Sequence, residues 1–406
     1  MKRLRLATTA ATTLLVTLLV AAIAYASTTG AFHITRAAQR HVAVASPSPP
    51  TVPLPSEPSK PTSVPTPVLP TPVPPPTLYP GKTGPFVLDA DFIDASHGWA
   101  LITNCIQPGP EQCTYSTAST VNSGATWSRP VQVGPSFAPT DGDAPRSIRF
   151  LNQGDGFVYG HSGAFVTHDG AKTWTNIGIQ ATFVGNLAIG GGTAWAVTDP
   201  CARGVICPFE VRSSVDGGRT WSAPHALPNY SPDIAYAFPF GLILSDVAQR
   251  QIQLATSAGA QWRTVTAPCD PSTIRADATT VDGLELWVVC SGSISQAGPG
   301  FAQVLFISED SGQSWRQSLS FPQTGFGSVV ASRPLVAFTS TEPATFGTHD
   351  GGLSWFPATA EGATFTTIRF SGSEWGWAID RKRGLWTTTN GGDSWGQAGV
   401  VPNTLS

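Results

Sequence analysis

Three arginines occur in short segments that resemble one another. Arg149 lies in "SIRF" and Arg369 in "TIRF", each eight residues before an aromatic side chain, and Arg275 lies in the looser copy "TIRA". A guanidinium group can bind a carboxylate through two parallel hydrogen bonds. We therefore interpret Arg149, Arg275 and Arg369 as candidate ligand-binding residues for an acidic partner. The alternative is that each arginine pairs with a neighbouring acid of the chain itself.

Carboxylates raise a second possibility, glycoside hydrolysis, which needs two of them at a set separation. The candidates are Asp89, Asp91, Asp94, Asp141, Asp143, Asp155, Asp277 and Glu374. The sequence pairs no two of them in space, so no catalytic residue is assigned. The segment "DADFID" at 89–94 has an acidic spacing similar to a calcium loop but lacks its glycine and terminal glutamate, so no metal site is predicted.

An eight-residue motif combines a hydroxyl, a carboxylate, glycine and tryptophan. It occurs seven times, and some copies depart from the pattern at one or more of these positions. The copies are Thr120–Trp127, Thr167–Trp174, Ser214–Trp221, Ala255–Trp262, Ser308–Trp315, Thr348–Trp355 and Thr388–Trp395. Successive tryptophans are 47, 47, 41, 53, 40 and 40 residues apart. A repeat of about 40–50 residues has the size of a propeller blade. This regular recurrence favours a structural role for the motif over a catalytic one.

Each repeat also contains four short runs of strand-forming residues separated by turn signals. In the last repeat these runs are Phe365–Phe370, Glu374–Asp380, Gly384–Thr388 and Trp395–Val401. In the fourth repeat the pattern of the second run is not clearly recognisable, and its counterpart lies near 235–244. The sequence therefore predicts an all-β fold, a seven-bladed β-propeller with four-stranded blades, over residues 86–403.

The motif S-x-D-x-G-x-[TS]-W is identified as the Asp-box, or bacterial neuraminidase repeat, and the chain resembles Asp-box propellers over about residues 84–402. Sialidases, xyloglucan-degrading hydrolases and sortilin-type receptors share this motif. The combination with second strands such as "HGWALI" at 97–102 is most similar to the photosystem II assembly/stability-factor-like propellers. That resemblance implies a binding or assembly module. The photosynthetic role itself is not carried over, because it does not explain the export signal and the long proline-rich segment at the N-terminus, which are described below.

The alternative function is that of a glycoside hydrolase of exo-sialidase-like type. Such enzymes need an arginine triad, a Tyr–Glu pair and an acidic Asp, and they usually carry an R-I-P-like motif early in the domain. The chain has arginines but no such motif, and seven blades depart from the six of sialidases. We expect instead a non-catalytic monomer that binds an extracytoplasmic protein or glycan and uses no cofactor.

The resemblance implies that the acidic position of the Asp-box accepts backbone N–H groups and holds the turn closed. The residues at this position are Asn122, Asp169, Asp216, Asp310, Asp350 and Asn390. The second glycine position permits a positive φ. Ala171 departs from it, and Gly170 beside it is placed to absorb the strain.

The N-terminus predicts export. The basic segment "MKRLR" precedes an apolar run that ends in Ala24-Tyr25-Ala26, so residues 1–26 are a signal peptide or a membrane anchor. Residues 27–85 form a proline-rich linker, expected to be an extended, disordered stalk. Either reading places the propeller outside the cytoplasm, with the N-terminal helix, if uncleaved, as the sole membrane contact.

Six cysteines form three close pairs, which predicts three disulfides made in an oxidising compartment. The pairs are Cys105/Cys113, Cys201/Cys207 and Cys269/Cys290. A metal site is the alternative, but neither C-x-x-C spacing nor nearby histidine is present.

Three insertions should lie on the propeller face opposite the Asp-boxes, at 104–113, 199–207 and 291–300. They form a candidate binding surface, although braced loops could equally serve to resist proteolysis. The net charge of −3 and a pI near 6.1 argue against a nucleic-acid partner.

Overall fold

The structure is a computed structural model in which the propeller domain is described from Pro85 onward. The predicted signal or anchor at 1–26, and all of the predicted linker except Pro85, lie outside the described residues. No helix long and apolar enough to cross a membrane occurs in the described part of the chain. That part comprises residues 85–106, 112–138, 144–160, 163–177, 179, 183–201, 207–227, 234–238, 241–246, 250–256, 261–271, 273–292, 303–319, 321, 327–341, 344–358, 360, 363–399 and 401.

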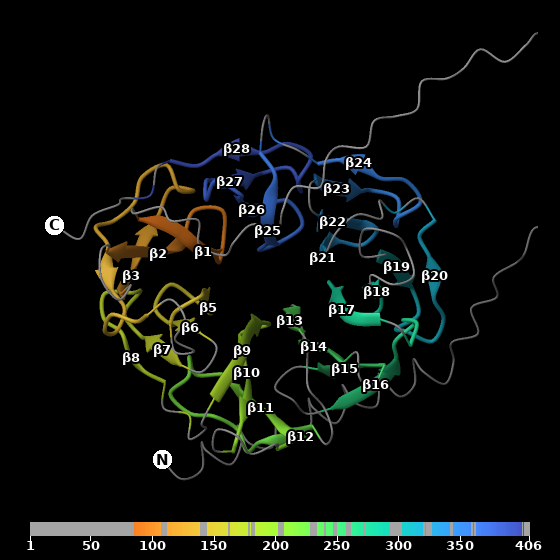
Figure 1. The fold of residues 1–406 in the computed structure, drawn as a ribbon, viewed down its shortest axis with the longest axis horizontal. Helices are drawn as coiled ribbons and strands as arrows, with labels where there is room; N and C mark the ends of the chain where they lie inside the picture. Colours follow the sequence, from red (N-terminus) through yellow and green to blue (C-terminus); the bar gives the residue numbers. More distant parts are fainter. Residues whose placement is uncertain are drawn as a thin grey trace, which may run out of the picture. The chain divides into compact units, whose positions relative to one another are not determined.

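The described strands form seven four-stranded antiparallel sheets, and each sheet uses four consecutive strands. Figure 1 shows these sheets arranged as blades around a common centre, with the first strand of each blade innermost. The prediction of a seven-bladed all-β propeller is therefore confirmed.

Blades 1 to 3 contain the first twelve strands. Blade 1 comprises β1 (Phe86–Phe92), β2 (Gly98–Ile106), β3 (Gln112–Thr120) and β4 (Val131–Gln132); blade 2 comprises β5 (Ser147–Phe150), β6 (Gly156–Tyr159), β7 (Ala164–Thr167) and β8 (Thr175–Asn176); blade 3 comprises β9 (Phe183–Gly190), β10 (Thr193–Asp199), β11 (Phe209–Ser214) and β12 (His225–Leu227).

Blades 4 to 7 complete the ring. Blade 4 comprises β13 (Ile234–Phe238), β14 (Gly241–Asp246), β15 (Gln251–Thr256) and β16 (Trp262–Thr266); blade 5 comprises β17 (Thr273–Thr280), β18 (Leu286–Gly292), β19 (Gln303–Ser308) and β20 (Arg316–Gln317); blade 6 comprises β21 (Gly327–Arg333), β22 (Val336–Thr341), β23 (Ala344–Thr348) and β24 (Phe356–Pro357); blade 7 comprises β25 (Phe365–Phe370), β26 (Gly376–Asp380), β27 (Leu385–Thr388) and β28 (Gly396–Gln397).

The outermost strand is the main difference from the sequence prediction. A run at 395–401 was expected in blade 7, whereas β28 contains two residues, Gly396 and Gln397, both exposed. An outer strand can pair on one side only, and most of the chain between the Asp-box and the next blade is connection. The run near 235–244 in blade 4 is divided between β13 and β14.

Glycine and aromatic residues fix the register of the first hairpin in three blades. Gly98, Gly156 and Gly376 each begin the second strand, opposite Phe92, Phe150 and Phe370 respectively. A Cβ on any of these glycines would lie within 2.3–2.6 Å of the facing ring, so the ring covers the glycine. The shared register makes positions in these first strands directly comparable.

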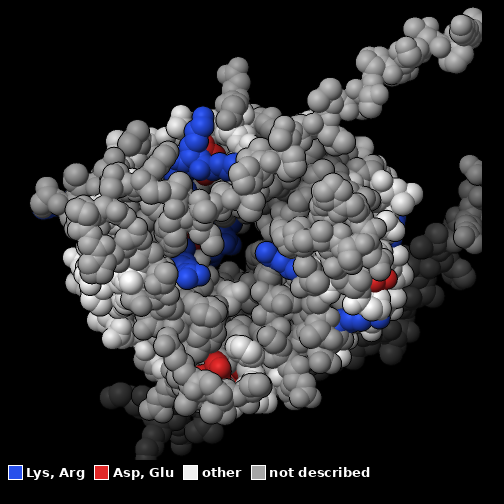
Figure 2. All heavy atoms as spheres, in the orientation of Figure 1, with Lys and Arg blue, Asp and Glu red and all other residues white. Residues whose placement is uncertain are grey.

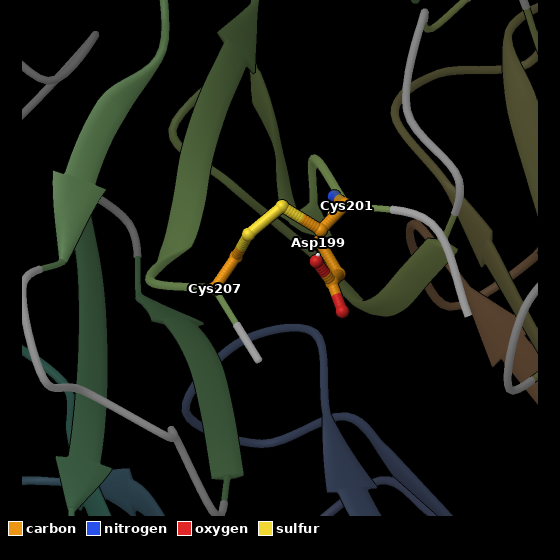
Figure 3. Close-up of side chains that lie close together, drawn as sticks. All are labelled: Asp199, Cys201 and Cys207. Carbon is orange, nitrogen blue, oxygen red and sulfur yellow. Dashed lines mark hydrogen bonds between the residues drawn. A yellow bond between two sulfur atoms is a disulfide. The ribbon is translucent and has the colours of Figure 1, made fainter. Parts of the chain in front are cut away.

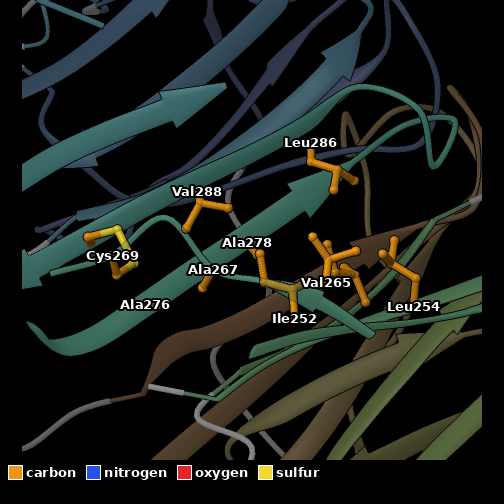
Figure 4. Close-up of a cluster of buried hydrophobic side chains, with 11 residues drawn as sticks. Ile252, Leu254, Val265, Ala267, Cys269, Ala276, Ala278, Leu286 and Val288 are labelled. Carbon is orange, nitrogen blue, oxygen red and sulfur yellow. A yellow bond between two sulfur atoms is a disulfide. The ribbon is translucent and has the colours of Figure 1, made fainter. Parts of the chain in front are cut away.

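The hydrophobic core is divided among the blade junctions. Buried clusters from two neighbouring blades meet at each of the seven junctions in the described structure. Figure 4 shows the junction of blades 4 and 5, where Ile252 and Val265 pack with Leu286 and Val288. Burial of these aliphatic side chains, at about 1.5–3 kcal/mol each, holds neighbouring blades together.

The Asp-box turns satisfy their polar groups locally. In blade 3, Asp216 accepts hydrogen bonds from Ser214 Oγ (2.8 Å), Thr220 N (2.9 Å) and Thr220 Oγ1 (2.5 Å), and Gly218 N donates to Ser214 Oγ (2.8 Å). Corresponding bonds occur in the described copies of blades 1, 2, 5, 6 and 7. These bonds support the interpretation that the acidic position of the Asp-box stabilises the turn. The residues at this position are Asn122, Asp169, Asp216, Asp310, Asp350 and Asn390. The blade 4 copy at 255–262 falls partly outside the described residues.

Ala171 shows how strongly the Asp-box fixes its backbone. Its φ is 73°, and that of Gly170 is 76°, so the preceding glycine does not take up the strain on its behalf. The turn imposes positive φ at both positions, and Ala171 N donates to Thr167 Oγ1 at 3.0 Å.

Candidate ligand-binding cavity

The first strands of blades 7, 1 and 2 place three charged residues at the same register position. Arg369 pairs with Trp377, Asp91 with Trp99 and Arg149 with Phe157 across the first hairpin of each blade. The spacing of eight residues between arginine and aromatic residue thus marks a real structural equivalence. The central wall of the propeller carries charges in the order positive, negative, positive across two blade junctions.

Arg149 forms an ion pair with Asp89 across the junction of blades 1 and 2. Its Nη1 donates to Asp89 Oδ2 at 2.6 Å and also to the carbonyl of Ile148, and both charged side chains are over 90% buried. Burial alone would lower the pKa of Arg149, but the nearby Asp89 carboxylate raises it overall. The arginine is therefore permanently charged and largely neutralised by Asp89, as the alternative interpretation of its role expected.

Asp89 has a counterpart in blade 5. Asp89 Oδ2 accepts a hydrogen bond from Ile148 N (3.1 Å), and Asp277 Oδ2 accepts one from Val329 N (3.2 Å). In both cases a buried carboxylate of one blade binds the first strand of the next blade. These two candidates for a glycosidase pair serve junctions far apart in the ring.

Asp91 is buried at the register position that lies, blade by blade, between those of Arg369 and Arg149. Its Oδ2 accepts a hydrogen bond from Phe150 N at 2.7 Å. Burial raises the pKa of Asp91 to about 6, although Arg149, the Phe150 N–H and Arg369 all act to lower it. A buried carboxyl group with a raised pKa therefore lies in the first strand between those that carry Arg369 and Arg149.

Arg369 and Arg275 keep hydrogen-bonding capacity that the described residues do not use. The Nε of half-buried Arg369 is buried without a hydrogen-bond partner in the part of the chain that the structure describes. Arg275 is exposed, pairs with Ser291 in the strand register, and has no ion-pair or hydrogen-bond partner for its side chain among the described residues. Because Arg275 lies four residues before Thr279, the position equivalent to Arg369, it is at the other end of the first strand.

These residues line a central cavity with a volume of about 1050 Å³. Both ends of the first strands contribute to its wall, for example Arg146 and Ser147 at the start of β5 and Phe370 to Ser373 at the end of β25. Figure 2 shows basic side chains gathered around the central hollow. The charged residues of the described lining are Arg146, Arg149, Arg275, Arg333, Arg369, Asp91 and Asp282.

Sequence reasoning missed Arg146, Arg333 and Asp282 as cavity residues. Arg146 precedes β5 and is exposed, Arg333 ends β21 and donates to Ser373 O at 3.0 Å, and Asp282 follows β17. A search for charges at the two ends of each first strand and in the residues that flank it would have found them.

The other carboxylate candidates do not converge on this cavity. Asp94 accepts hydrogen bonds from its own turn, and Asp155 binds the side chains of His168 and Arg219 at 2.8 and 2.9 Å. Glu374 lines a separate, smaller cavity of about 350 Å³ between blades 6 and 7. Asp141 and Asp143 lie outside the described residues.

All three predicted disulfides are present: Cys105–Cys113, Cys201–Cys207 and Cys269–Cys290. They agree with an extracytoplasmic protein. Figure 3 shows Asp199 beside Cys201 and Cys207, the one cluster of potential metal ligands found in the described chain. Its two sulfur atoms are bonded to each other, so no thiolate remains to bind a metal. The insertion at 291–300 lies almost entirely outside the described residues.

No protein-family model and no curated protein matches the chain. Solved structures do match in fold. A structure described as YCF48 bound to D1 peptide has a TM-score of 0.51 at 16% identity, covering 76% of this chain and 94% of that one. YCF48 from Cyanidioschyzon merolae has a TM-score of 0.51 at 16% identity, with 77% and 97% covered.

An ancestral GH74 enzyme matches with a TM-score of 0.52 at 13% identity, covering 78% of this chain but 47% of that chain. The chain thus spans under half the length of that enzyme. At these identities the comparisons show the fold, a propeller shared by binding proteins and hydrolases. They agree with the Asp-box propeller resemblance seen in the sequence and leave function to be argued from the cavity.

Proposed function

We propose that the propeller is a non-catalytic, extracytoplasmic binding module whose central cavity holds an acidic segment of a partner polypeptide. The observation that carries this proposal is the unbalanced charge of the cavity. Five arginines and two aspartates are in the described lining, although the whole chain has a net charge of −3. Of these arginines, Arg149 alone has a carboxylate partner among the described residues.

Unused guanidinium groups on a concave wall favour a ligand that supplies the missing carboxylates. Arg275 and Arg146 are exposed to the cavity with no side-chain partner in the described structure, and Arg369 has an unpaired buried Nε. A carboxylate can accept two hydrogen bonds from one guanidinium, which adds geometric selectivity to charge attraction. The cavity therefore suits a chain that carries several carboxylates.

A polypeptide is the favoured form of that ligand over a glycan. One of the structures with a similar fold is YCF48 with a bound D1 peptide, so a propeller of this kind is able to hold a peptide. The fold likeness supports the class of partner and does not identify the partner of this protein. Acidic peptides present carboxylates on flexible side chains that can reach arginines at both ends of the first strands.

The proposal is tested by isothermal titration calorimetry with hexa-aspartate at low ionic strength, where exposed charges are least screened. We expect Arg275→Ala and Arg369→Gln each to weaken binding by about tenfold or more, since each removes a charge-assisted hydrogen bond worth roughly 1.5–3 kcal/mol. The matched control is Arg129→Ala, because Arg129 is exposed but is not among the described cavity residues. Equal weakening by the control variant would refute a cavity-specific site.

A second titration with penta-galacturonate separates the classes of partner. Binding of the sugar acid without binding of hexa-aspartate would replace the polypeptide by an acidic glycan. Turnover of a fluorogenic sialoside, lost in Arg149→Ala or Arg369→Ala, would instead support the glycoside hydrolase alternative and overturn the non-catalytic proposal.

A further inference from the structure

Asp91 occupies the place in the cavity where an external carboxylate would be expected. It lies at the register position between Arg369 of blade 7 and Arg149 of blade 2, and all three residues line the cavity. Arg149 already has Asp89 as its partner. Arg369, with an unpaired Nε, is therefore the guanidinium that Asp91 and a ligand would share.

Asp91 is held in this place by the backbone of the next blade. The bond from Phe150 N to Asp91 Oδ2 holds the carboxyl group in this orientation. A neutral carboxylic acid, or an amide, can accept the same hydrogen bond. The anchor therefore persists when the charge is removed, and only the electrostatics of the cavity change.

Few other charged groups act on Asp91. Arg149 of β5, Arg369 of β25 and Asp89 of β1 itself influence its carboxyl group. The packed strand β2 carries no ionisable side chain, because its Cys105 is in a disulfide, and Asp380 of β26 pairs with the far end of β25, opposite Phe365. No histidine occurs in the described lining, so Asp91 is the group there that changes charge near neutral pH.

We propose that Asp91 is an internal competitor of the ligand, so that the cavity binds a partner's carboxylate tightly when Asp91 is protonated and weakly when it is ionised. This inference rests on the proposed function, since it concerns the same cavity and ligand class. Ionised Asp91 neutralises Arg369 and repels an incoming carboxylate. Protonated Asp91 leaves Arg369 free, and its O–H group can donate a hydrogen bond to the ligand.

The charge of Asp91 changes in the pH range just below neutral. Its pKa of about 6 means that mild acidification below neutral converts the cavity from the weak to the strong binding state. Coupling between proton and ligand is reciprocal, so the ligand must also raise the pKa of Asp91. Binding near pH 7 is therefore accompanied by proton uptake.

The experiment measures hexa-aspartate affinity of the wild-type protein and Asp91→Asn between about pH 8 and about pH 5, a range in which free aspartate side chains remain ionised. The wild-type affinity should rise about tenfold on acidification, equivalent to about one pKa unit of coupling. The Asp91→Asn variant should bind at every pH about as tightly as the wild type at acid pH. The control variant Asp282→Asn changes the other described cavity aspartate, which is exposed, and should keep the wild-type pH profile.

A wild-type profile without pH dependence, or an unchanged profile in Asp91→Asn, would overturn the role of Asp91. The cavity proposal would still stand in that case if Arg275→Ala weakens binding, and it fails separately if Arg275→Ala has no effect. If Asp91→Asn does not fold, calorimetry of the wild type at about pH 7 in buffers of different ionisation enthalpy gives the answer. Uptake of a fraction of a proton on binding is expected, and its absence contradicts the inference.

Discussion

The Asp-box turns and the first strands both recur in every blade, but they use their polar residues in opposite ways. Each described Asp-box satisfies its carboxylate or amide within eight residues, with the same bonds in blade after blade. At the equivalent first-strand position of six blades, all except blade 4, the residues differ: Asp91, Arg149, Ala188, Thr279, Val330 and Arg369. Uniform residues with local partners indicate a role in folding. Residues that diverge at an equivalent position, among them Arg369 with an Nε that has no partner in the described structure, indicate a role in binding.

The largest effect on stability is expected at Asp89, a charged residue of a first strand whose hydrogen bonds join blades 1 and 2. Asp89→Ala leaves the Arg149 guanidinium buried without its carboxylate and Ile148 N without its acceptor. We expect the free energy of unfolding to fall by roughly 3–5 kcal/mol, measured by denaturant titration. Arg275→Ala is the contrasting variant, with a change within about 0.5 kcal/mol. If both variants lose the same stability, the distinction between paired and unpaired cavity charges is wrong.

The next effect tests the uniformity of the Asp-box turns. Gly392 has a φ of 96°, and a Cβ there would lie 2.3 Å from the Phe338 ring of blade 6. Gly392→Ala should cost about 2–4 kcal/mol from backbone strain and overpacking combined, with no loss of hexa-aspartate affinity in the folded protein. Gly396→Ala, in the same blade, meets no atom within 4 Å and should change stability by less than about 0.5 kcal/mol. Comparable losses in the two variants would contradict this account of the turn.

The smallest effect is the pH dependence of the Asp-boxes. Hydrogen bonds from the Ser354 hydroxyl and then from its backbone N–H hold the pKa of Asp350 at about 2, against about 3.9 in an unfolded chain. Because the folded pKa is the lower one, this stabilisation is complete above about pH 4 and is lost as pH falls through about 2. The loss should stay below about 1 kcal/mol, since the Asp350 side chain is only partly buried and solvent screens its charge.

Acid unfolding of Asp350→Asn measures that effect. The variant should lose less stability than the wild type between about pH 4 and pH 2. Asn390, whose Nδ2 donates to Ser394 Oγ at 2.8 Å, shows that an amide fits the turn. A variant as acid-sensitive as the wild type would place the pH dependence elsewhere.

The sequence predicted most of the repeated part of the molecule. Blade number, Asp-box turns and disulfide pairs could be read because each depends on residues close together in the chain, such as Cys105 and Cys113. The register equivalence of Arg149 and Arg369 was also visible, because both lie eight residues before their strand partners.

The cavity could be predicted only in part, because its contacts join different blades. The pairing of Arg149 with Asp89 spans 60 residues, and nothing local distinguishes this arginine from Arg369, which has no ion pair among the described residues. Asp91 was one of eight candidate carboxylates named from the sequence. Burial raises the pKa of Asp91 to about 6, and residues of blades 2 and 7 also act on this carboxyl group of blade 1, so its pKa depends on contacts between blades. Arg275 looked like a third copy but lies at the opposite end of its strand.

The ring closes without an exchange of strands between its first and last blades. Every described sheet uses consecutive strands, and blades 7 and 1 are joined by bonds such as Trp377 Nε1 to Ala90 O, between residues 287 positions apart. The other junctions join blades that follow each other in the chain. Loop-closure entropy grows with the length of chain between the partners. We therefore expect the junction between blades 7 and 1 to form last during folding and to open first during unfolding. The lifetime of this junction would then set the rate at which the whole propeller unfolds.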